Sequence, residues 1–235
     1  MEVLDASAKL TLSLRVTGTR PDGYHLLDAE MVTLDLVDTL RFEEGDGLDI
    51  GGAAGEGVPT DDANIVRRAL ALIGRKAHVT IDKRIPPGGG LGGGSADAAA
   101  VLRWAGVDDV GLALQLGADV PFCLLGGRAR VTGVGEILEP LPRERRVFTL
   151  VLPPFGCSTA GVYRKWDELG GPHDVGGNDL EPAALAVEPR LAAWRDRLGE
   201  ATGQQPHLAG SGSTWFVEGE FPGDGRIVVQ TAGVR

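Results

Sequence analysis

The chain has 235 residues, of which 43% are hydrophobic and 24% are charged, and its formal net charge is −10. This composition excludes a disordered chain, because it supplies ample apolar material for a core. The acidic balance argues against a general nucleic-acid-binding protein, which needs a basic surface. Anionic small molecules stay open as ligands, because a local site can be positive within a negative molecule.

The cellular location of the protein and the redox state of its cysteines can be predicted from motifs that the sequence lacks. The N-terminal residues contain neither a basic segment nor an apolar run, and no stretch of about 18 apolar residues occurs, so we expect neither a signal peptide nor a membrane span. Cys123 and Cys157 match no metal-ligand spacing and are expected to be buried, reduced thiols. We therefore expect a cytoplasmic protein without nucleic-acid or membrane partners. We separately expect a monomer or a weak homodimer.

The N-terminal part of the chain predicts strands. Residues 8–16 alternate apolar and polar side chains, which is typical of a half-buried strand, with Lys9 and Thr11 on its polar face. Residues 31–42 predict one or two further strands. Residues 43–59 are rich in glycine and acidic residues and predict an exposed loop or hairpin.

Helices and short strands are interspersed from residue 60 onward. Apolar residues at helical spacing predict a helix over 63–73, capped by Asp61 or Asp62. The later predicted elements are a strand at 78–81, helices at 95–104 and 110–116, a strand at 147–152, helices within 162–166 and 182–198, and strands at 214–217 and 226–229. Because regular βαβ alternation is missing, an α+β fold fits better than a doubly wound sheet. The charged, proline-containing residues 140–146 predict a boundary between domains at 1–145 and 146–235.

Glycine is concentrated in one segment. The chain has 36 glycines, and six of them lie between Gly88 and Gly94, on both sides of Leu91. These glycines follow a predicted strand and two prolines, and they precede a predicted helix. Successive glycine N–H groups can curl around an anion, and a helix N-terminus adds further donors. Residues 86–95 are therefore predicted to form a phosphate-binding loop rather than a flexible linker.

Neither common nucleotide motif fits this loop. The dinucleotide pattern matches only because nearly every residue is glycine, and the P-loop pattern needs a Gly-Lys pair that the chain lacks. Residues 86–96 instead resemble the phosphate loop of the GHMP small-molecule kinases. Further short motifs resemble the family and occur in the family's order along the chain. They lie at 8–10, 20–25, 62–64, 81–86, 116–122, 133–136 and 210–213. Together they resemble the branch that phosphorylates 4-diphosphocytidyl-2-C-methyl-D-erythritol in the non-mevalonate route to isoprenoid precursors.

The resemblance implies a two-domain fold with the active site in the cleft between the domains. The N-terminal domain would be similar to the second domain of ribosomal protein S5, and the C-terminal domain would be ferredoxin-like. The implied reaction transfers the γ-phosphate of ATP, with Mg²⁺, to a hydroxyl of the cytidine-diphosphate substrate. The implied ATP-binding residues are Pro87, Gly88, Gly89, Gly90, Leu91, Gly92, Gly93, Gly94, Ser95, Asn64 and Lys83. Ser95 either caps the helix or contacts phosphate or magnesium, and no other metal ligand is predicted.

The resemblance also assigns catalytic roles to two residues. Asp119 would accept, or at least orient, the proton of the substrate hydroxyl. Lys9 would keep that carboxylate ionised and offset charge on the transferring phosphoryl group. Taken singly, Asp119 reads more simply as a turn or cap residue and Lys9 as a solvent-exposed lysine. Only the joint pattern favours catalysis.

The remaining implied residues would bind the substrate. His25 would read the cytosine by hydrogen bonds, with Tyr24 and Tyr163 as aromatic partners, although Tyr163 could equally be a core residue. Thr159 and the second glycine motif, Gly210-Ser211-Gly212, would lie beside the substrate. Thr11 would also contact substrate, but the family usually has asparagine at this position, and threonine is shorter and lacks the amide.

Two alternative functions stay open. The first is a GHMP kinase for another hydroxylated substrate, such as homoserine or a mevalonate derivative, against which Tyr24 and His25 argue. The second is a non-catalytic nucleotide-binding protein, against which the joint presence of Lys9 and Asp119 argues. Thr11 and the shortened segments at 100–117 and 170–178 distinguish the chain from typical family members.

Overall fold

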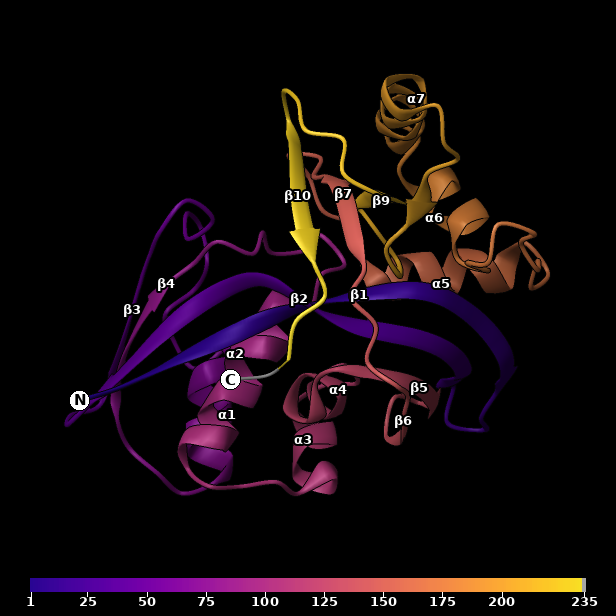
Figure 1. Ribbon diagram of the computed structural model, residues 1–235. Coiled ribbons are helices and arrows are strands. Elements are labelled where there is room, and N and C mark those ends of the chain that lie inside the picture. The colour runs from indigo at the N-terminus through magenta and orange to yellow at the C-terminus, as the bar shows by residue number, and fades with distance from the viewer. Residues whose placement is uncertain (234–235) are drawn as a thin grey trace.

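The computed structural model describes residues 1–233 and contains two β-sheets stacked as separate layers (Figure 1). The first sheet has six strands: β1 (Glu2–Thr19), β2 (His25–Glu43), β3 (Gly47–Gly51), β4 (His78–Asp82), β5 (Arg128–Gly133) and β6 (Ile137–Pro140). The second has four: β7 (Val147–Val151), β8 (His207–Leu208), β9 (Trp215–Glu218) and β10 (Arg226–Gln230). The chain is therefore α+β, as predicted.

A long antiparallel hairpin forms the centre of the first sheet. The alternation in residues 8–16 does mark a strand, but β1 extends well beyond both ends of that pattern and pairs with β2 along nearly its whole length. The opposite edge of β2 pairs with β5 over its first half and with β4 over its second half. Register shifts along β1 let so long a hairpin bend across the molecule.

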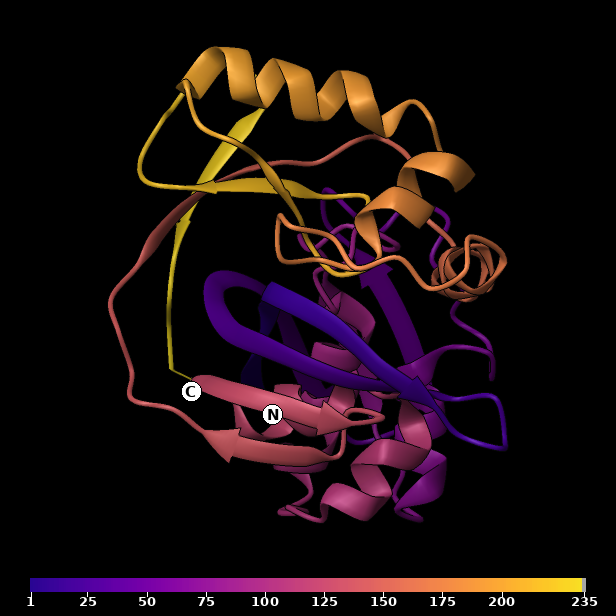
Figure 2. The same ribbon diagram turned by 90° about the vertical axis from the view of Figure 1, so that its right-hand side faces the viewer.

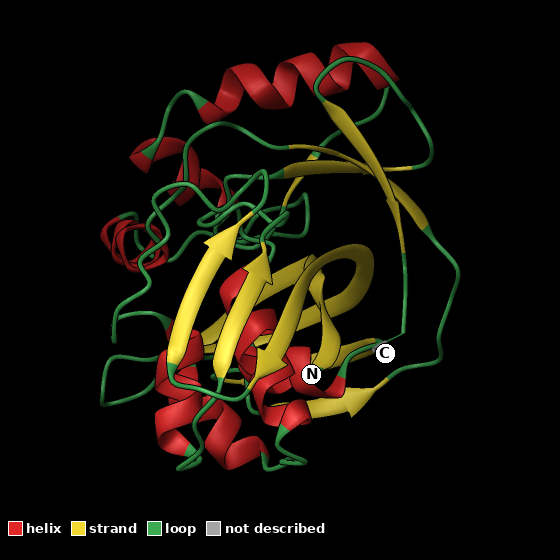
Figure 3. Cartoon of the chain, turned by 90° about the vertical axis from the view of Figure 1, so that its left-hand side faces the viewer, coloured by secondary structure: helices red, strands yellow, loops and turns green. Residues whose placement is uncertain are grey.

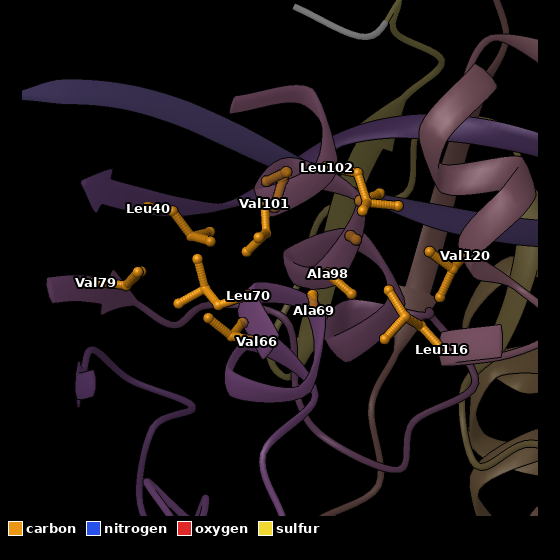
Figure 4. Packing of buried hydrophobic residues seen from close by; sticks show 14 of the residues in the cluster. Leu40, Val66, Ala69, Leu70, Val79, Ala98, Val101, Leu102, Leu116 and Val120 are labelled. Atoms are coloured by element: carbon orange, nitrogen blue, oxygen red, sulfur yellow. The ribbon is translucent and has the colours of Figure 1, made fainter. Parts of the chain in front are cut away.

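Four helices cover one face of this sheet: α1 (Ile65–Leu72), α2 (Gly93–Trp104), α3 (Val110–Leu116) and α4 (Val120–Leu125) (Figures 1 and 3). The alanine run of α2 is fully buried, which lets the helix pack closely against its neighbours. Figure 4 shows the resulting core, in which Val101 and Leu102 of α2 lie among Leu40, Leu70 and Val120.

The helix boundaries correct three details of the predictions. Asn64, not Asp61 or Asp62, caps α1, because its side chain accepts a hydrogen bond from the N–H of Val66 at 2.8 Å. The segment 120–125, for which no element was predicted, is helical, because proline is tolerated in the first turn of a helix, where Pro121 lies. The apolar pattern at 182–198 forms two helices, since Pro189 interrupts it.

The glycine-rich segment at 43–59 also contains more order than predicted. Residues 47–51 form β3, which pairs in parallel with β4. Parallel pairing joins residues distant in sequence and leaves no turn signal to recognise. The prediction of an exposed loop therefore holds only for the residues around this strand.

The second layer combines the four-stranded sheet with α5 (Thr159–Glu168), α6 (Glu181–Val187) and α7 (Leu191–Thr202). Figure 2 shows this layer above the first, with two chain crossings joining the layers along one side: the connection from β6 to β7 and the chain that follows β10. No helix among residues 1–233 is long and apolar enough to span a membrane.

A third hydrophobic cluster joins the two layers. It combines Leu10 and Leu34 of the first sheet with Phe148 and Phe216 of the second, and it contains the fully buried Leu91. The glycine-rich loop is thus anchored where the layers meet. Cys123 and Cys157 are buried free thiols, as predicted, and burial raises the pKa of the Cys123 thiol to about 12.

Candidate active site

The glycine loop, residues 86–92, connects β4 to α2 and is clamped from both layers. The backbone N–H of Lys9 donates to the carbonyl of Leu91 at 3.0 Å, and the N–H of Thr214 donates to the carbonyl of Gly89 at 3.1 Å. Gly90 and Gly92 adopt the left-handed conformation, with φ of 77° and 67°. These turns, held by fixed partners, give the loop a defined shape rather than the freedom of a linker.

Two close approaches explain why this loop needs glycine. A Cβ atom on Gly90 would lie 2.3 Å from the carbonyl oxygen of Ala209, and one on Gly92 would lie 2.8 Å from Cγ of Lys9. The loop backbone therefore lies directly against the lysine and against the second glycine motif. Any side chain here would push the phosphate loop away from the groups predicted to act with it.

Lys9 and Asp119 lie together, although 110 positions separate them in the chain. The ammonium Nζ of Lys9 is 3.2 Å from Oδ2 of Asp119, and it donates to the hydroxyl of Thr11 at 3.0 Å. The Lys9 side chain is 6% exposed and the Asp119 side chain 34% exposed. A buried cation thus holds a carboxylate that still faces open space, which suits a carboxylate that must receive a proton from a bound hydroxyl.

The turn between β5 and β6 lies against the residue that precedes Asp119. A Cβ atom on Gly135 would lie 2.3 Å from the carbonyl oxygen of Ala118, so this turn packs against the residue just before the aspartate. Glu136 closes the turn by accepting a hydrogen bond from the N–H of Val134 at 2.6 Å. The Gly-Val-Gly-Glu motif, to which no role was assigned from sequence, therefore packs beside the residue that precedes Asp119.

Two adjoining cavities open at this point. The inner cavity, of about 270 Å³, is lined by Lys9, Thr11, Gly90, Ser95 and Asp119 among others. The outer cavity, of about 550 Å³, is lined by Tyr24 and His25 among others. Leu27, Ala118, Thr159 and Tyr163 line both cavities. A ligand that extends from one into the other would bring a hydroxyl group to Asp119.

An aromatic cluster forms one wall of the outer cavity. The rings of His25 and Tyr163 stack with centroids 4.8 Å apart, and Trp166 meets His25 edge-on at 5.6 Å. Nε2 of His25 lies 2.8 Å from Oδ1 of Asp167, which fixes the orientation of the imidazole. Tyr24 lines the same cavity but is 64% exposed and does not join the stack in this structure.

The phenol of Tyr163 holds its proton more firmly than that of a free tyrosine. Burial, and secondarily the charge of Asp119, raises its pKa. The residue lines both cavities, and its ring stacks on that of His25. Tyr163 thus links the two halves of the candidate site.

The second glycine motif closes the other side of the inner cavity. Gly210 and Ser211 line it, and the Ser211 hydroxyl lies 3.0 Å from that of Thr159. The amide of Asn178 donates to the carbonyl of Gly210 at 2.7 Å and to that of Leu208 at 2.9 Å. One buried asparagine thus fixes the shape of the motif.

Three of the predicted nucleotide-site residues have distinct positions. Ser95 is the third residue of α2, whose cap position is Gly92, and its side chain lines the inner cavity. Asn64 caps α1 through its carbonyl oxygen and donates to the carbonyl of Pro59 at 2.7 Å. Lys83 is buried in ion pairs with Asp38 and Asp97 and does not line either cavity.

The residues of the inner cavity fit a nucleotide with magnesium. Gly90 of the loop lines this space together with Ser95 and Asp119, whose side chains carry oxygen atoms, the ligand type that magnesium prefers. Within residues 1–233, no group of three or more His, Cys, Asp or Glu side chains could hold a metal.

Sequence reasoning missed three residues that shape the site, namely Asp167, Asn178 and Gly135. Asp167 and Asn178 act on residues more than 30 positions away, so no local pattern reveals them. Gly135 lies in a motif that was noted, but its contact with Ala118 follows only from the packing of the β5–β6 turn.

A glycine loop at a helix start, with a lysine and an aspartate facing one cavity, defines a small-molecule kinase of the GHMP class. Residues 63–127 match the family model described as GHMP kinases N terminal domain. The structure also resembles L. major mevalonate kinase in complex with R-mevalonate, with a TM-score of 0.66 at 12% identity over 99% of this chain and 96% of the other. That likeness shows the fold alone.

More similar proteins identify the branch. The 4-diphosphocytidyl-2-C-methyl-D-erythritol kinase of Cereibacter sphaeroides (strain ATCC 17029 / ATH 2.4.9) is 39% identical, over 90% of this chain and 87% of its own. A crystal structure of 4-(cytidine 5'-diphospho)-2C-methyl-D-erythritol kinase matches with a TM-score of 0.78 at 32% identity, covering 99% of this chain and 100% of the other. The chain belongs to the 4-diphosphocytidyl-2-C-methyl-D-erythritol kinase family.

Proposed function

We propose that the protein transfers the γ-phosphoryl group of ATP to a hydroxyl of 4-diphosphocytidyl-2-C-methyl-D-erythritol, as a step in isoprenoid precursor synthesis. The observation that supports this most directly is the Lys9–Asp119 pair, which lines the inner cavity together with Gly90, while Ala118, the residue before Asp119, also lines the aromatic-lined cavity. ATP phosphates would occupy the loop and the inner cavity, and the cytidine would occupy the outer cavity. Family membership supports the same assignment.

The proposed transfer needs one proton acceptor and one fixed positive charge. The acceptor hydroxyl gives its proton to Asp119 as its oxygen bonds to the γ-phosphorus. The bond from that phosphorus to the β-bridging oxygen breaks, and ADP leaves with the electron pair. Lys9 lies within 3.2 Å of Asp119 and offsets the negative charge gathered there. Magnesium, when bound, would neutralise charge on the phosphate oxygens, and Ser95, which lines the inner cavity, would help to hold it.

The substrate end would be read by the aromatic cluster. His25, oriented by Asp167, presents its ring to the outer cavity, and Tyr163 and Tyr24 provide aromatic surfaces for the cytosine. Thr159, Thr11 and the Gly210–Gly212 motif would contact the diphosphate and the methylerythritol chain. Homoserine and mevalonate offer no base to occupy this part of the site.

ADP release in the presence of different acceptors tests the proposal. The purified protein, with ATP and magnesium, is offered the cytidine-diphosphate substrate, homoserine or mevalonate in parallel. We expect ADP release that depends on the first acceptor alone. ADP release with homoserine or mevalonate would show that the protein acts on a different substrate. ATP binding without turnover on any acceptor would indicate a non-catalytic nucleotide-binding protein.

Replacement of Gly90 with alanine tests the nucleotide half of the site. We expect ATP affinity to fall at least about tenfold, because the new Cβ meets the Ala209 carbonyl at 2.3 Å and must displace the loop. Gly106→Ala is the matched control: Gly106 has a similar φ of 72° but no atom within 4 Å of its Cβ position. ATP dissociation constants from calorimetry would compare the two. Equal affinities would show that the loop does not hold the nucleotide.

Replacement of Asp167 with asparagine tests the base-reading half. We expect KM for the cytidine substrate to rise about three- to tenfold with KM for ATP unchanged, because the imidazole of His25 loses its charged partner. Asp49→Asn is the matched control, since Asp49 makes a similar 2.9 Å contact with His78 at a distant strand edge. Steady-state kinetics with each substrate varied would separate the effects. An unchanged KM for the cytidine substrate would remove His25 from the proposed recognition.

A further inference from the structure

Three charged side chains are buried together between β2, the start of the glycine loop and α2. Nζ of Lys83 contacts Oδ2 of Asp38 and lies 2.7 Å from Oδ2 of Asp97. The three side chains are 3%, 0% and 5% exposed, so water does not screen their interaction. Buried charges of this kind contribute little net stability compared with apolar residues, which suggests a role in holding a particular geometry.

Each member of this group is tied to a different flank of the loop. Asp38 lies on β2, and its Oδ1 accepts hydrogen bonds from the backbone N–H groups of Arg84 and of Ile85, the latter at 2.8 Å. These two residues lead directly into the glycine loop. Asp97 lies in the second turn of α2, the helix that leaves the loop. Lys83 joins the two carboxylates and thereby both ends of the loop.

The helix start also rests on Lys83. A Cβ atom on Gly93, the first residue of α2, would lie 3.0 Å from Nζ of Lys83 and 2.9 Å from Cγ2 of Ile85. A shift of the lysine would therefore move the first N–H groups of α2, which are the donors available to a phosphate. The ammonium group of Lys83 thus helps to fix the position of the helix start relative to the loop.

We propose that Asp38, Lys83 and Asp97 form a positioning triad, which sets the glycine loop and the start of α2 in the arrangement that binds nucleotide phosphates. This inference rests on the proposed nucleotide-binding role of the loop. Lys83 then acts from behind the loop without touching the nucleotide. The ammonium group of Lys83 is paired with the carboxylates of Asp38 and Asp97, and Lys83 lines neither cavity.

Asp97 is the less firmly held of the two carboxylates. Its Oδ1 is buried and has no hydrogen-bond partner within residues 1–233, whereas both oxygens of Asp38 are engaged. Burial raises its pKa, an effect that Lys83 offsets only in part. Asp97 is therefore the member whose alteration should loosen the helix start with the least damage to the core.

Nucleotide binding by Asp97→Asn and Lys83→Met, measured by calorimetry without any acceptor substrate, tests the triad. We expect the dissociation constant for ATP to rise about tenfold in each, with KM for the acceptor unchanged. The double variant should bind ATP more tightly than the product of the two single effects predicts, because both act through one contact. Lys76→Met is the matched control, since Lys76 makes an exposed ion pair with Asp46 at 2.8 Å.

Other outcomes would overturn the proposal. If Lys83 instead contacted the nucleotide directly, Asp97→Asn would release it and leave ATP affinity unchanged or tighter. If the variants melted at a lower temperature but bound ATP as tightly as wild type, the triad would have a purely structural role. Asp97→Asn preserves side-chain size, so it keeps the test informative if Lys83→Met does not fold. Because the readout needs no acceptor, failure of the acceptor assignment would leave this test intact.

Discussion

Replacing Asp119 with asparagine is expected to lower kcat by about 10²–10⁴-fold while ATP affinity stays within about twofold of wild type. Asparagine keeps the size of the side chain but cannot take the proton of the acceptor hydroxyl. The carboxylate contacts Lys9 and faces the inner cavity, and it makes no hydrogen bond to the glycine loop. The loss should therefore fall on the chemical step and not on nucleotide binding. Steady-state kinetics together with ATP calorimetry would measure both.

Asp196→Asn is the control for this substitution, because Asp196 is an exposed aspartate of α7 paired with the neighbouring Arg195. We expect its kcat to match that of wild type. Turnover of Asp119→Asn at more than about a tenth of the wild-type rate would lie outside the expected range for loss of a general base. That result would leave Asp119 only the task of orienting the hydroxyl.

Replacing Lys9 with methionine is expected to lower kcat by about 10²–10³-fold, the usual effect of removing one electrostatic contact to a developing charge. Methionine fills similar volume, so the packing against Gly92 can survive while the charge next to Asp119 is lost. The Thr11 hydroxyl would lose the 3.0 Å hydrogen bond that it accepts from Nζ of Lys9. Single-turnover measurements of phosphoryl transfer would isolate this effect from product release.

Lys76→Met serves again as the control, because it removes a lysine whose side chain is 79% exposed. A melting curve for Lys9→Met would show whether the unpaired Asp119 also destabilises the fold. A Lys9→Met enzyme that keeps wild-type single-turnover rates would show that the lysine acts only in packing. Reduced stability at an unchanged rate would lead to the same conclusion.

Local sequence patterns predicted much of the fold. The alternation in 8–16 placed a strand, and the alanine run placed α2, because both signals arise from side chains that repeat on one face. The parallel pairing of β3 with β4 was missed, as was the helix at 120–125. Pairing between distant segments and a proline in a first turn leave weak local signals, so tertiary packing decides them.

The sequence likewise predicted some parts of the candidate site correctly and left the positions of other residues undetermined. Leu91 among glycines argued against a flexible linker, and the structure buries that leucine in the cluster between the two layers. Asn64 and Lys83 were expected near the nucleotide. The structure uses one as a helix cap and the other in a buried ion cluster. A polar side chain in a motif does not reveal by itself which way it points.

The sequence by itself determined the chemistry available to this protein: a backbone cradle for phosphate, one lysine, one aspartate and a histidine with aromatic partners. The tertiary structure decided which of these groups meet. Lys9 and Asp119 contact each other because β1 and the start of α4 converge beside the glycine loop. Asp167 reaches His25 because α5 of the second layer packs over the end of the hairpin. Such contacts join residues more than a hundred positions apart, and only the packing of whole layers specifies them.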